Sequence, residues 1–140
     1  IFATENRYEG APSVRVTEVD ASTPFPLFGQ EVIPIAVEHG SLPILGYRIG
    51  KLAYITDAKH IQEAELSKLY KVDTLVLNAL RKAPHPTHLN IAEAMEIVKE
   101  VHPRQAFFTH ISQTMGFHAK VQKELPKNVY LAYDKLTIKI

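Results

Sequence analysis

The sequence contains no cysteine, and this absence excludes disulfide bonds, thiolate catalysis and zinc sites built from cysteine. It also lacks an apolar run long enough to span a bilayer. The first ten residues show neither the basic segment nor the apolar segment of a secretory signal. We therefore expect a cytoplasmic protein with no membrane partner, in which any metal is held by histidine, aspartate or glutamate.

Strong charge of either sign is missing as well. The formal net charge is +1, which is too small for the basic surface of a nucleic-acid-binding protein, so we do not expect a nucleic-acid partner. The phosphate-binding motifs G-x-x-x-x-G-K-[ST] and G-x-G-x-x-G are absent, and so is the nucleophile motif G-x-S-x-G. What is present is a chain of 140 residues, 46% of them hydrophobic, which is enough for one domain with a buried core.

Strand patterns dominate the first half of the chain. Residues 14–19 alternate between apolar and polar side chains, which predicts a half-buried strand. Residues 21–30 contain two prolines and a glycine, which predicts a loop. Three apolar runs then predict a strand, a turn through residues 40–43 and a hairpin that turns near Gly50 and Lys51. These runs are residues 31–40, 44–50 and 51–57.

Helix and strand patterns alternate in the second half. Apolar residues at helical spacing predict helices, with Asn90 as the N-cap of the clearest one; the helices span 61–70, 90–101 and 117–125. Apolar runs predict strands over 73–80, 104–110 and 129–133, and the last of these is expected to form a terminal hairpin with 136–140. This alternation predicts an α/β layered domain that forms a single unit.

Residues that can carry chemistry follow these strands. His39, Asp57 and His110 each stand at the end of a predicted strand, and His88 lies in the loop before the helix 90–101. Because ligands gather at the carboxyl ends of strands in α/β sheets, we expect the four side chains to converge. Three imidazoles and one carboxylate are ligands that zinc and manganese accept. A bound metal would acidify a water molecule and polarise a phosphoryl or acyl oxygen.

The alternative is that these residues only close strands and turns. A single histidine or aspartate after a strand is commonly a capping residue, and Asp57 could cap the helix that follows it. His60, His85 and His102 each neighbour a charged residue or a proline, so we expect them on the surface. The spacing alone leaves both interpretations open.

Five segments together resemble the metallo-β-lactamase-fold hydrolases. They are VEHGSLPILGYRIGKLAYITD, LVLNALR, HPTHLN, FFTHIS and LPKNVYLAYDKLTIKI. The chain is similar to the bacterial phosphodiesterase branch, which is related to the cyclic phosphodiesterase of phosphonate degradation. The tRNA 3′-processing endonuclease is a more distant relative. The resemblance runs from about Tyr8 to Ile140.

The resemblance implies a dinuclear site for two divalent metal ions, zinc or manganese. In such a site His39 would ligate one metal, Asp57 would bridge both, and His110 would ligate the second. His88 would donate a proton to the leaving group or contact the phosphate. The activity implied is that of a phosphodiesterase acting on a small or cyclic phosphodiester through a metal-bound hydroxide, with Asp57 and His88 as its catalytic residues.

The family's first metal motif, H-x-H-x-D-H, is absent from this sequence, and no two histidines stand two positions apart. We therefore expect residues 1–140 to be the C-terminal half of an αββα sandwich, a mixed sheet with helices on one face. Its partner would be the N-terminal half of the domain, and alone it would be inactive. Gln113 stands where relatives often have a histidine, which leaves His118 as either a substrate-side residue or an ordinary helix residue.

Two alternative functions remain open. The first is a non-catalytic interaction or scaffold domain with the same fold, in which exposed apolar surface drives homodimerisation or strand exchange. The second is an endonuclease of the tRNA 3′-processing type, against which the near-neutral charge counts.

Overall fold

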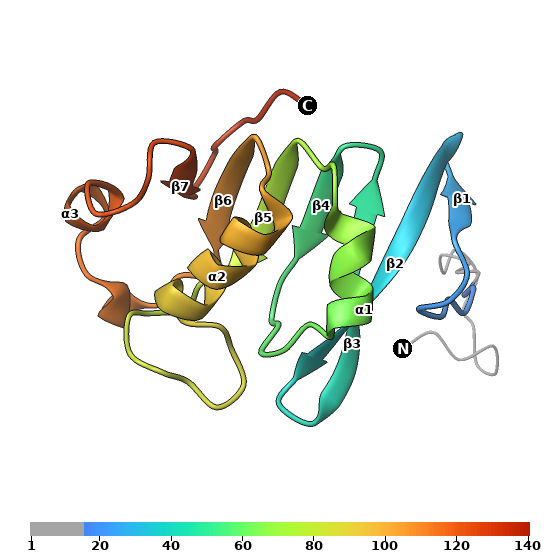
Figure 1. Ribbon diagram of the computed structural model, residues 1–140, viewed down its shortest axis with the longest axis horizontal. Coiled ribbons are helices and arrows are strands. Elements are labelled where there is room, and N and C mark those ends of the chain that lie inside the picture. The colour runs from blue at the N-terminus through green and yellow to red at the C-terminus, as the bar shows by residue number, and fades with distance from the viewer. Residues whose placement is uncertain (1–15) are drawn as a thin grey trace, which may run out of the picture.

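The structure is a computed structural model that describes residues 16–140. Seven strands form one sheet in the order in which they occur in the chain (Figure 1). Neighbouring strands are antiparallel from β1 to β4 and parallel from β4 to β7, so the sheet is mixed, as predicted. The strands are β1 (Phe25–Leu27), β2 (Gln30–His39), β3 (Leu42–Ile49), β4 (Leu52–Ile55), β5 (Thr74–Asn78), β6 (Gln105–Thr109) and β7 (Val129–Leu131).

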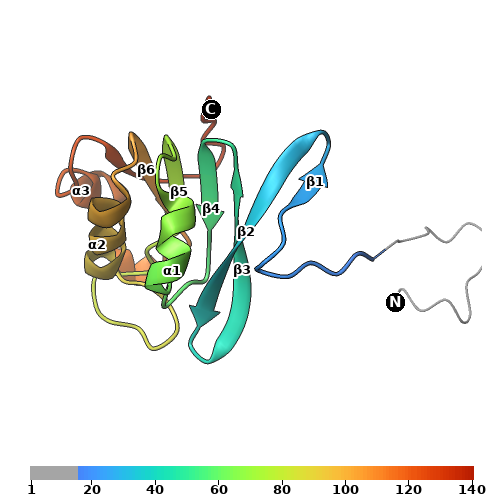
Figure 2. The ribbon, with the colours of Figure 1, turned by 45° about the vertical axis from the view of Figure 1, so that its right-hand side comes forward.

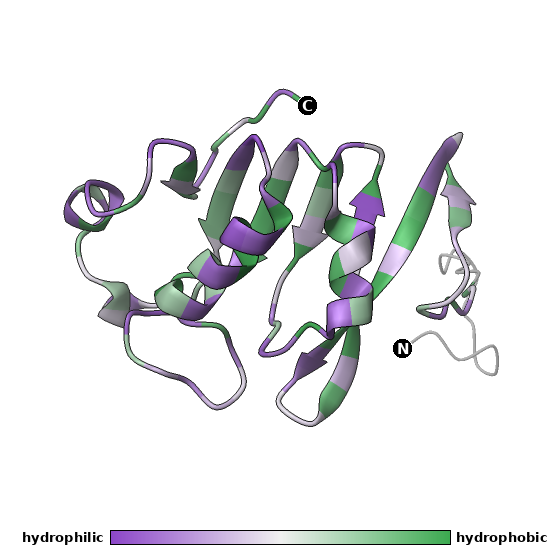
Figure 3. Cartoon of the chain, in the orientation of Figure 1, coloured by the Kyte–Doolittle hydropathy of each residue, from purple (hydrophilic) through white to green (hydrophobic). Residues whose placement is uncertain are grey.

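Three short α-helices accompany the sheet, and two of them lie on the same face of it (Figure 2). These two are α1 (Glu63–Leu66), continued by a 3₁₀ turn over Ser67–Leu69, and α2 (Ile91–Val101), whereas α3 (His118–Gln122) lies beside β7. The main core forms between the sheet and α1 and α2. Hydrophobic residues line β4 to β6, and hydrophilic residues cover the outer side of α2 (Figure 3). This arrangement confirms the predicted α/β class.

A capping box starts α2 at the residue that the sequence predicted. Asn90 Oδ1 accepts the backbone N–H of Glu93 at 2.9 Å, and Glu93 Oε2 accepts the backbone N–H of Asn90 at 2.9 Å. Lys59 Nζ adds an ion pair to Glu93 Oε1 at 2.7 Å. Two backbone donors that the helix leaves free are thus satisfied, which fixes the direction in which the preceding loop enters α2.

Replacing Asn90 by alanine is expected to lower the free energy of unfolding by about 1 kcal/mol, because the N-terminus of the helix loses its cap. Urea denaturation measures the loss. Asn90→Asp is the matched control, since aspartate supplies the same acceptor and should retain most of the stability. If the aspartate variant lost as much stability as the alanine variant, the cap would not be the cause.

Three predictions about the sheet are wrong. Residues 16–19 form no strand, and Val16 is 80% exposed, because no neighbouring strand lies beside them; residues 14 and 15 lie outside the described residues. The predicted loop 21–30 contains β1, which pairs with β2. Prolines are tolerated there because β1 is an edge strand, whose outer side needs no backbone donor.

The terminal hairpin is also absent, since residues 136–140 form no strand. The outer edge of β7 is already occupied by side chains of α3. Gln122 donates to Val129 O at 2.9 Å and accepts from Leu131 N at 2.8 Å, so its amide takes the place of a neighbouring strand. His118 Nε2 lies 3.1 Å from Leu131 O. This capping closes an edge that would otherwise be open to pairing.

The face of the sheet away from α1 and α2 carries a row of large side chains. Strand register places them side by side from β3 to β7: Tyr47, Tyr54, Val76, Phe107 and Tyr130. Their neighbours Ile55, Leu77 and Phe108 belong to the core under the helices, and side chains alternate between faces along a strand, so the row points the opposite way. Tyr54 is 50% exposed and Tyr130 39% exposed.

Candidate metal centre

Three side chains converge at the carboxyl edge of the parallel strands. Asp57 follows β4, His110 follows β6, and His88 lies in the loop between β5 and α2. Asp57 Oδ1 lies 3.2 Å from His88 Nε2 and 3.3 Å from His110 Nε2. Donor atoms of the three residues all lie within 4.8 Å of one another. One carboxylate oxygen and two imidazole nitrogens at this spacing form a ligand set that a divalent metal accepts.

Two of the three converging residues have left-handed backbone conformations. The φ angle is 61° at Asp57 and 55° at His110. This region is unfavourable for most L-residues, although Asp and His visit it more often than others. Such conformations gather at functional sites, where the surrounding structure holds them in place. Here each one turns the chain at the end of a strand and presents the side chain at the same edge.

His39 ends β2 and packs edge-on against the ring of His88, with ring centroids 4.6 Å apart. Its Nδ1 lies 2.9 Å from both Asp57 O and Thr87 O. A nitrogen between two carbonyl oxygens must carry the proton, so in the neutral ring Nε2 is the free acceptor. Metal-binding histidines commonly hold their second nitrogen in this way. Of the four residues expected at this edge, His39 is the one outside the closest group of three.

Main-chain hydrogen bonds join the loops that carry these residues. Ala58, which follows Asp57, accepts from Leu89 N at 2.8 Å. Leu89 O in turn accepts from Leu80 N at 2.9 Å, and Leu80 O accepts from Ser112 N at 2.9 Å. This chain of bonds runs from the Asp57 loop through the His88 loop to the His110 loop. The site is therefore assembled on tied loops, although its residues are far apart in sequence.

The electrostatics of the site favour the protonation states that bind metal. Burial works against ionisation of Asp57, but hydrogen bonds from His88 and Thr56 and the charge of His110 outweigh it, and the pKa of Asp57 is lowered. The pKa of His88 is lowered as well, chiefly by burial and also by the neighbouring His110 and His39. The hydrogen bond between His88 and Asp57 acts in the opposite direction but does not outweigh them. An ionised carboxylate beside a neutral imidazole is what metal ligation requires.

His85 was expected on the surface; it is partly exposed, but it also lies against the cluster, which the sequence did not indicate. Its Nδ1 lies 3.2 Å from His88 Nδ1, and its half-buried ring contacts the cluster. The loop between β5 and α2 folds back on itself, which brings the two histidines of H-P-T-H together. His60 and His102 are exposed, as expected. The i, i+3 spacing in that motif was the signal that could have placed His85 beside His88.

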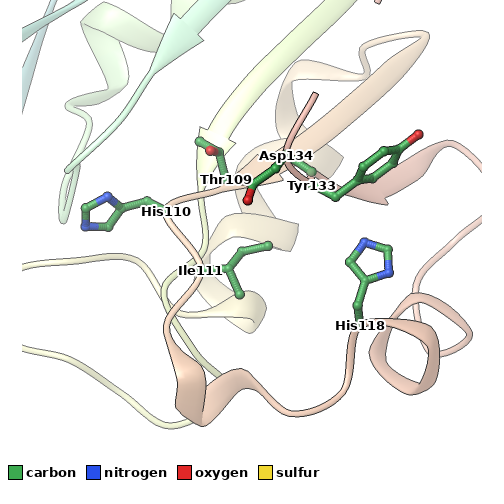
Figure 4. Close-up of a pocket in the computed structure, with 7 residues that line it drawn as sticks. Thr109, His110, Ile111, His118, Tyr133 and Asp134 are labelled. Atoms are coloured by element: carbon green, nitrogen blue, oxygen red, sulfur yellow. The ribbon is translucent and has the colours of Figure 1, made fainter. Parts of the chain in front are cut away.

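A cavity of about 340 Å³ opens beside His110 (Figure 4). Of the converging residues, His110 alone lines it, and in Figure 4 its ring points away from Ile111 and His118. His118 lines this cavity, but its Nε2 is bonded to β7, and Gln113 is exposed in a 3₁₀ turn over Gln113–Met115. The lining residues are Thr109, His110, Ile111, His118, Ala132, Tyr133 and Asp134.

Comparison with known proteins identifies the family. Residues 1–111 match the family described as Beta-lactamase superfamily domain. The chain belongs to this family. Among solved structures, the chain is similar to one described as a new diphosphatase from the PhnP family, with 36% identity and a TM-score of 0.87. The match covers 91% of this chain and 50% of that one. The resemblance to metallo-β-lactamase-fold hydrolases of the phosphodiesterase branch is thus confirmed.

Two further proteins are similar to this chain, one in fold alone and one in sequence. The metallo-β-lactamase-fold protein YhfI from Bacillus subtilis has a TM-score of 0.70 at 20% identity, over 83% of this chain and 52% of that one, and shows the shared fold. An octanoyltransferase of Porphyromonas gingivalis is 33% identical over 133 residues, which are 94% of this chain and 27% of that protein. The chain spans 50% of the diphosphatase, 52% of YhfI and 27% of the octanoyltransferase.

Proposed function

We propose that the protein is a metal-dependent phosphodiesterase that acts on a small or cyclic phosphodiester. The convergence of Asp57, His88 and His110 within 4.8 Å carries this proposal. Membership of a superfamily that includes metal-dependent hydrolases supports it, as does the similarity to a PhnP-family diphosphatase. The adjoining cavity beside His110 would receive a small substrate.

The donor atoms fit divalent metals such as zinc or manganese, because they are imidazole nitrogens and a carboxylate oxygen. In the proposed site His39, Asp57 and His110 would hold the metals. When bound, such metals supply an acidified water as nucleophile and polarise the phosphoryl oxygen. His88, with Nε2 directed at Asp57, would donate a proton to the departing oxygen.

The remaining ligands would come from an N-terminal half of the domain. The sequence has no H-x-H-x-D-H motif, so this chain supplies part of a site and would be inactive alone. The row of side chains from Tyr47 to Tyr130 is the surface against which that half would pack. A homodimer formed through the same row is the competing arrangement. The cytoplasm remains the proposed location, and no helix within residues 16–140 has the length and apolar character needed to cross a bilayer.

A scaffold domain is the alternative that the partly exposed row from Tyr47 to Tyr130 favours, since exposed aromatic side chains on a sheet face can bind a protein partner. An endonuclease of the tRNA 3′-processing type has less support. The short form of human tRNase Z matches at only 20% identity, which is evidence of fold alone, and the net charge of +1 offers little attraction to a phosphate backbone.

Metal analysis and turnover of the intact protein test the proposal together. Purified protein should contain divalent metal and hydrolyse bis(p-nitrophenyl) phosphate or a cyclic phosphate. Removal of the metal by a chelator should abolish hydrolysis, and zinc or manganese should restore it. Intact protein that binds no metal and turns over none of these esters would defeat the proposal and favour the scaffold.

A further inference from the structure

Asn78 is a buried polar residue whose side chain binds the backbone next to the candidate centre. It is the last residue of β5 and its exposed fraction is 0%. Its Oδ1 accepts the backbone N–H of Ala58 at 2.9 Å, and its Nδ2 donates to the backbone oxygen of Ala58 at 2.9 Å. Both ends of the side-chain amide therefore bind one residue, and that residue directly follows Asp57.

The local geometry explains why an amide is needed there. β4 pairs with β5 only as far as Ile55 and Leu77. The chain then leaves the ladder and turns through the left-handed Asp57, so the buried backbone of Ala58 has no strand partner. Buried backbone groups require hydrogen-bond partners. The side chain of Asn78 supplies them and extends the ladder by one step, up to the residue beside the carboxylate.

The same position reaches the other two converging residues. Ala58 O also accepts from Leu89 N at 2.8 Å, and Leu89 follows His88. In the parallel register, Asn78 pairs with Thr109, which precedes His110. One buried side chain thus lies at the junction of the three segments that carry the ligand set.

We infer that Asn78 is a positioning residue for the candidate metal centre. By holding Ala58, it keeps the carboxylate of Asp57 close enough to His88 and His110 for the three side chains to share a metal. This inference rests on the proposed metal-dependent function. Residues that orient metal ligands typically change metal affinity or activity by about 10–100-fold when they are replaced.

A matched control separates positioning from general stability. Thr74 opens the same strand at its opposite end, is 2% exposed, and accepts a hydrogen bond from Gln105 Nε2 at 2.9 Å. Thr74→Val removes a part-buried side-chain hydrogen bond from β5 and leaves the loops of the centre unchanged. It should lower the melting temperature and leave metal affinity unchanged.

The test compares Asn78→Ala, Asn78→Asp and Thr74→Val in the intact protein. Zinc affinity is measured by competition with a chelator, and melting temperature is recorded for each variant. We expect Asn78→Ala to weaken zinc binding by about tenfold or more. Asn78→Asp keeps the volume of the side chain but loses the donor to Ala58 O, so it should also weaken binding. If a folded Asn78 variant binds zinc as tightly as Thr74→Val does, the inference is overturned.

Two measurements on metal-free protein complete the design. Hydrogen exchange of the Ala58 amide in the unmodified protein should be slow, because a buried side chain holds it, and rapid exchange overturns the inference even if every variant fails to fold. Chemical shifts of the Asp57 carboxyl carbon and the His88 ring should move in the Asn78 variants and not in Thr74→Val. If those shifts move but the unmodified protein binds no zinc, the proposed metal function fails, and the role of Asn78 in positioning Asp57 through Ala58 stands.

Discussion

Replacing Asp57 by asparagine or alanine is expected to abolish hydrolysis by the intact protein and to remove bound metal. Asp57 is the single carboxylate among the converging donors, and its Oδ1 contacts both imidazoles. Loss of its charge should lower turnover by more than the roughly 10–100-fold expected for an outer partner. Steady-state hydrolysis of bis(p-nitrophenyl) phosphate and metal analysis of the purified variants measure the two effects.

The two substitutions separate chemistry from backbone strain. Asparagine tolerates the left-handed conformation found at Asp57, where φ is 61°, whereas alanine there should lose roughly 1–2 kcal/mol of stability. Asp57→Asn should therefore fold nearly as well as the unmodified protein and still be inactive. Full turnover in Asp57→Asn would refute the proposed role of this carboxylate.

Much of this edge could be predicted from the sequence because it depends on local patterns. Apolar runs that stop at a polar residue located the ends of β4 and β6, and the rule that ligands gather at carboxyl strand ends brought Asp57 and His110 to one edge. Asn90 was recognisable as a cap from the helix pattern that follows it. Such features need only the periodicity of a single element.

What could not be predicted depends on contacts between distant segments. The alternation in residues 136–140 fits a strand, but only the fold reveals that Gln122 already caps the edge of β7. Asn78 lay inside the predicted strand 73–80 with no role of its own, and its bonds to Ala58 span 20 positions in the chain. His85 was judged by its neighbouring prolines, although the loop folds it onto His88.

The role of His88 is where the resemblance and the geometry lead to different expectations. The resemblance makes His88 a proton donor, whereas the structure groups it with Asp57 and His110 as a potential ligand. A proton donor matters most when the departing oxygen is strongly basic, since a good leaving group departs unaided. A metal ligand matters equally for every substrate, because its loss removes the metal before any bond breaks.

His88→Ala should therefore be assayed with a series of phosphodiesters whose leaving groups increase in basicity. If His88 donates the proton, the variant keeps its metal and much of its activity towards bis(p-nitrophenyl) phosphate. Its loss of kcat then grows to about 10²–10⁴-fold for alkyl leaving groups. His60→Ala, which removes an exposed histidine, is the matched control and should behave like the unmodified protein throughout. Loss of metal with a uniform fall in kcat across the series would instead assign His88 to the ligand set that its 3.2 Å contact with Asp57 already outlines.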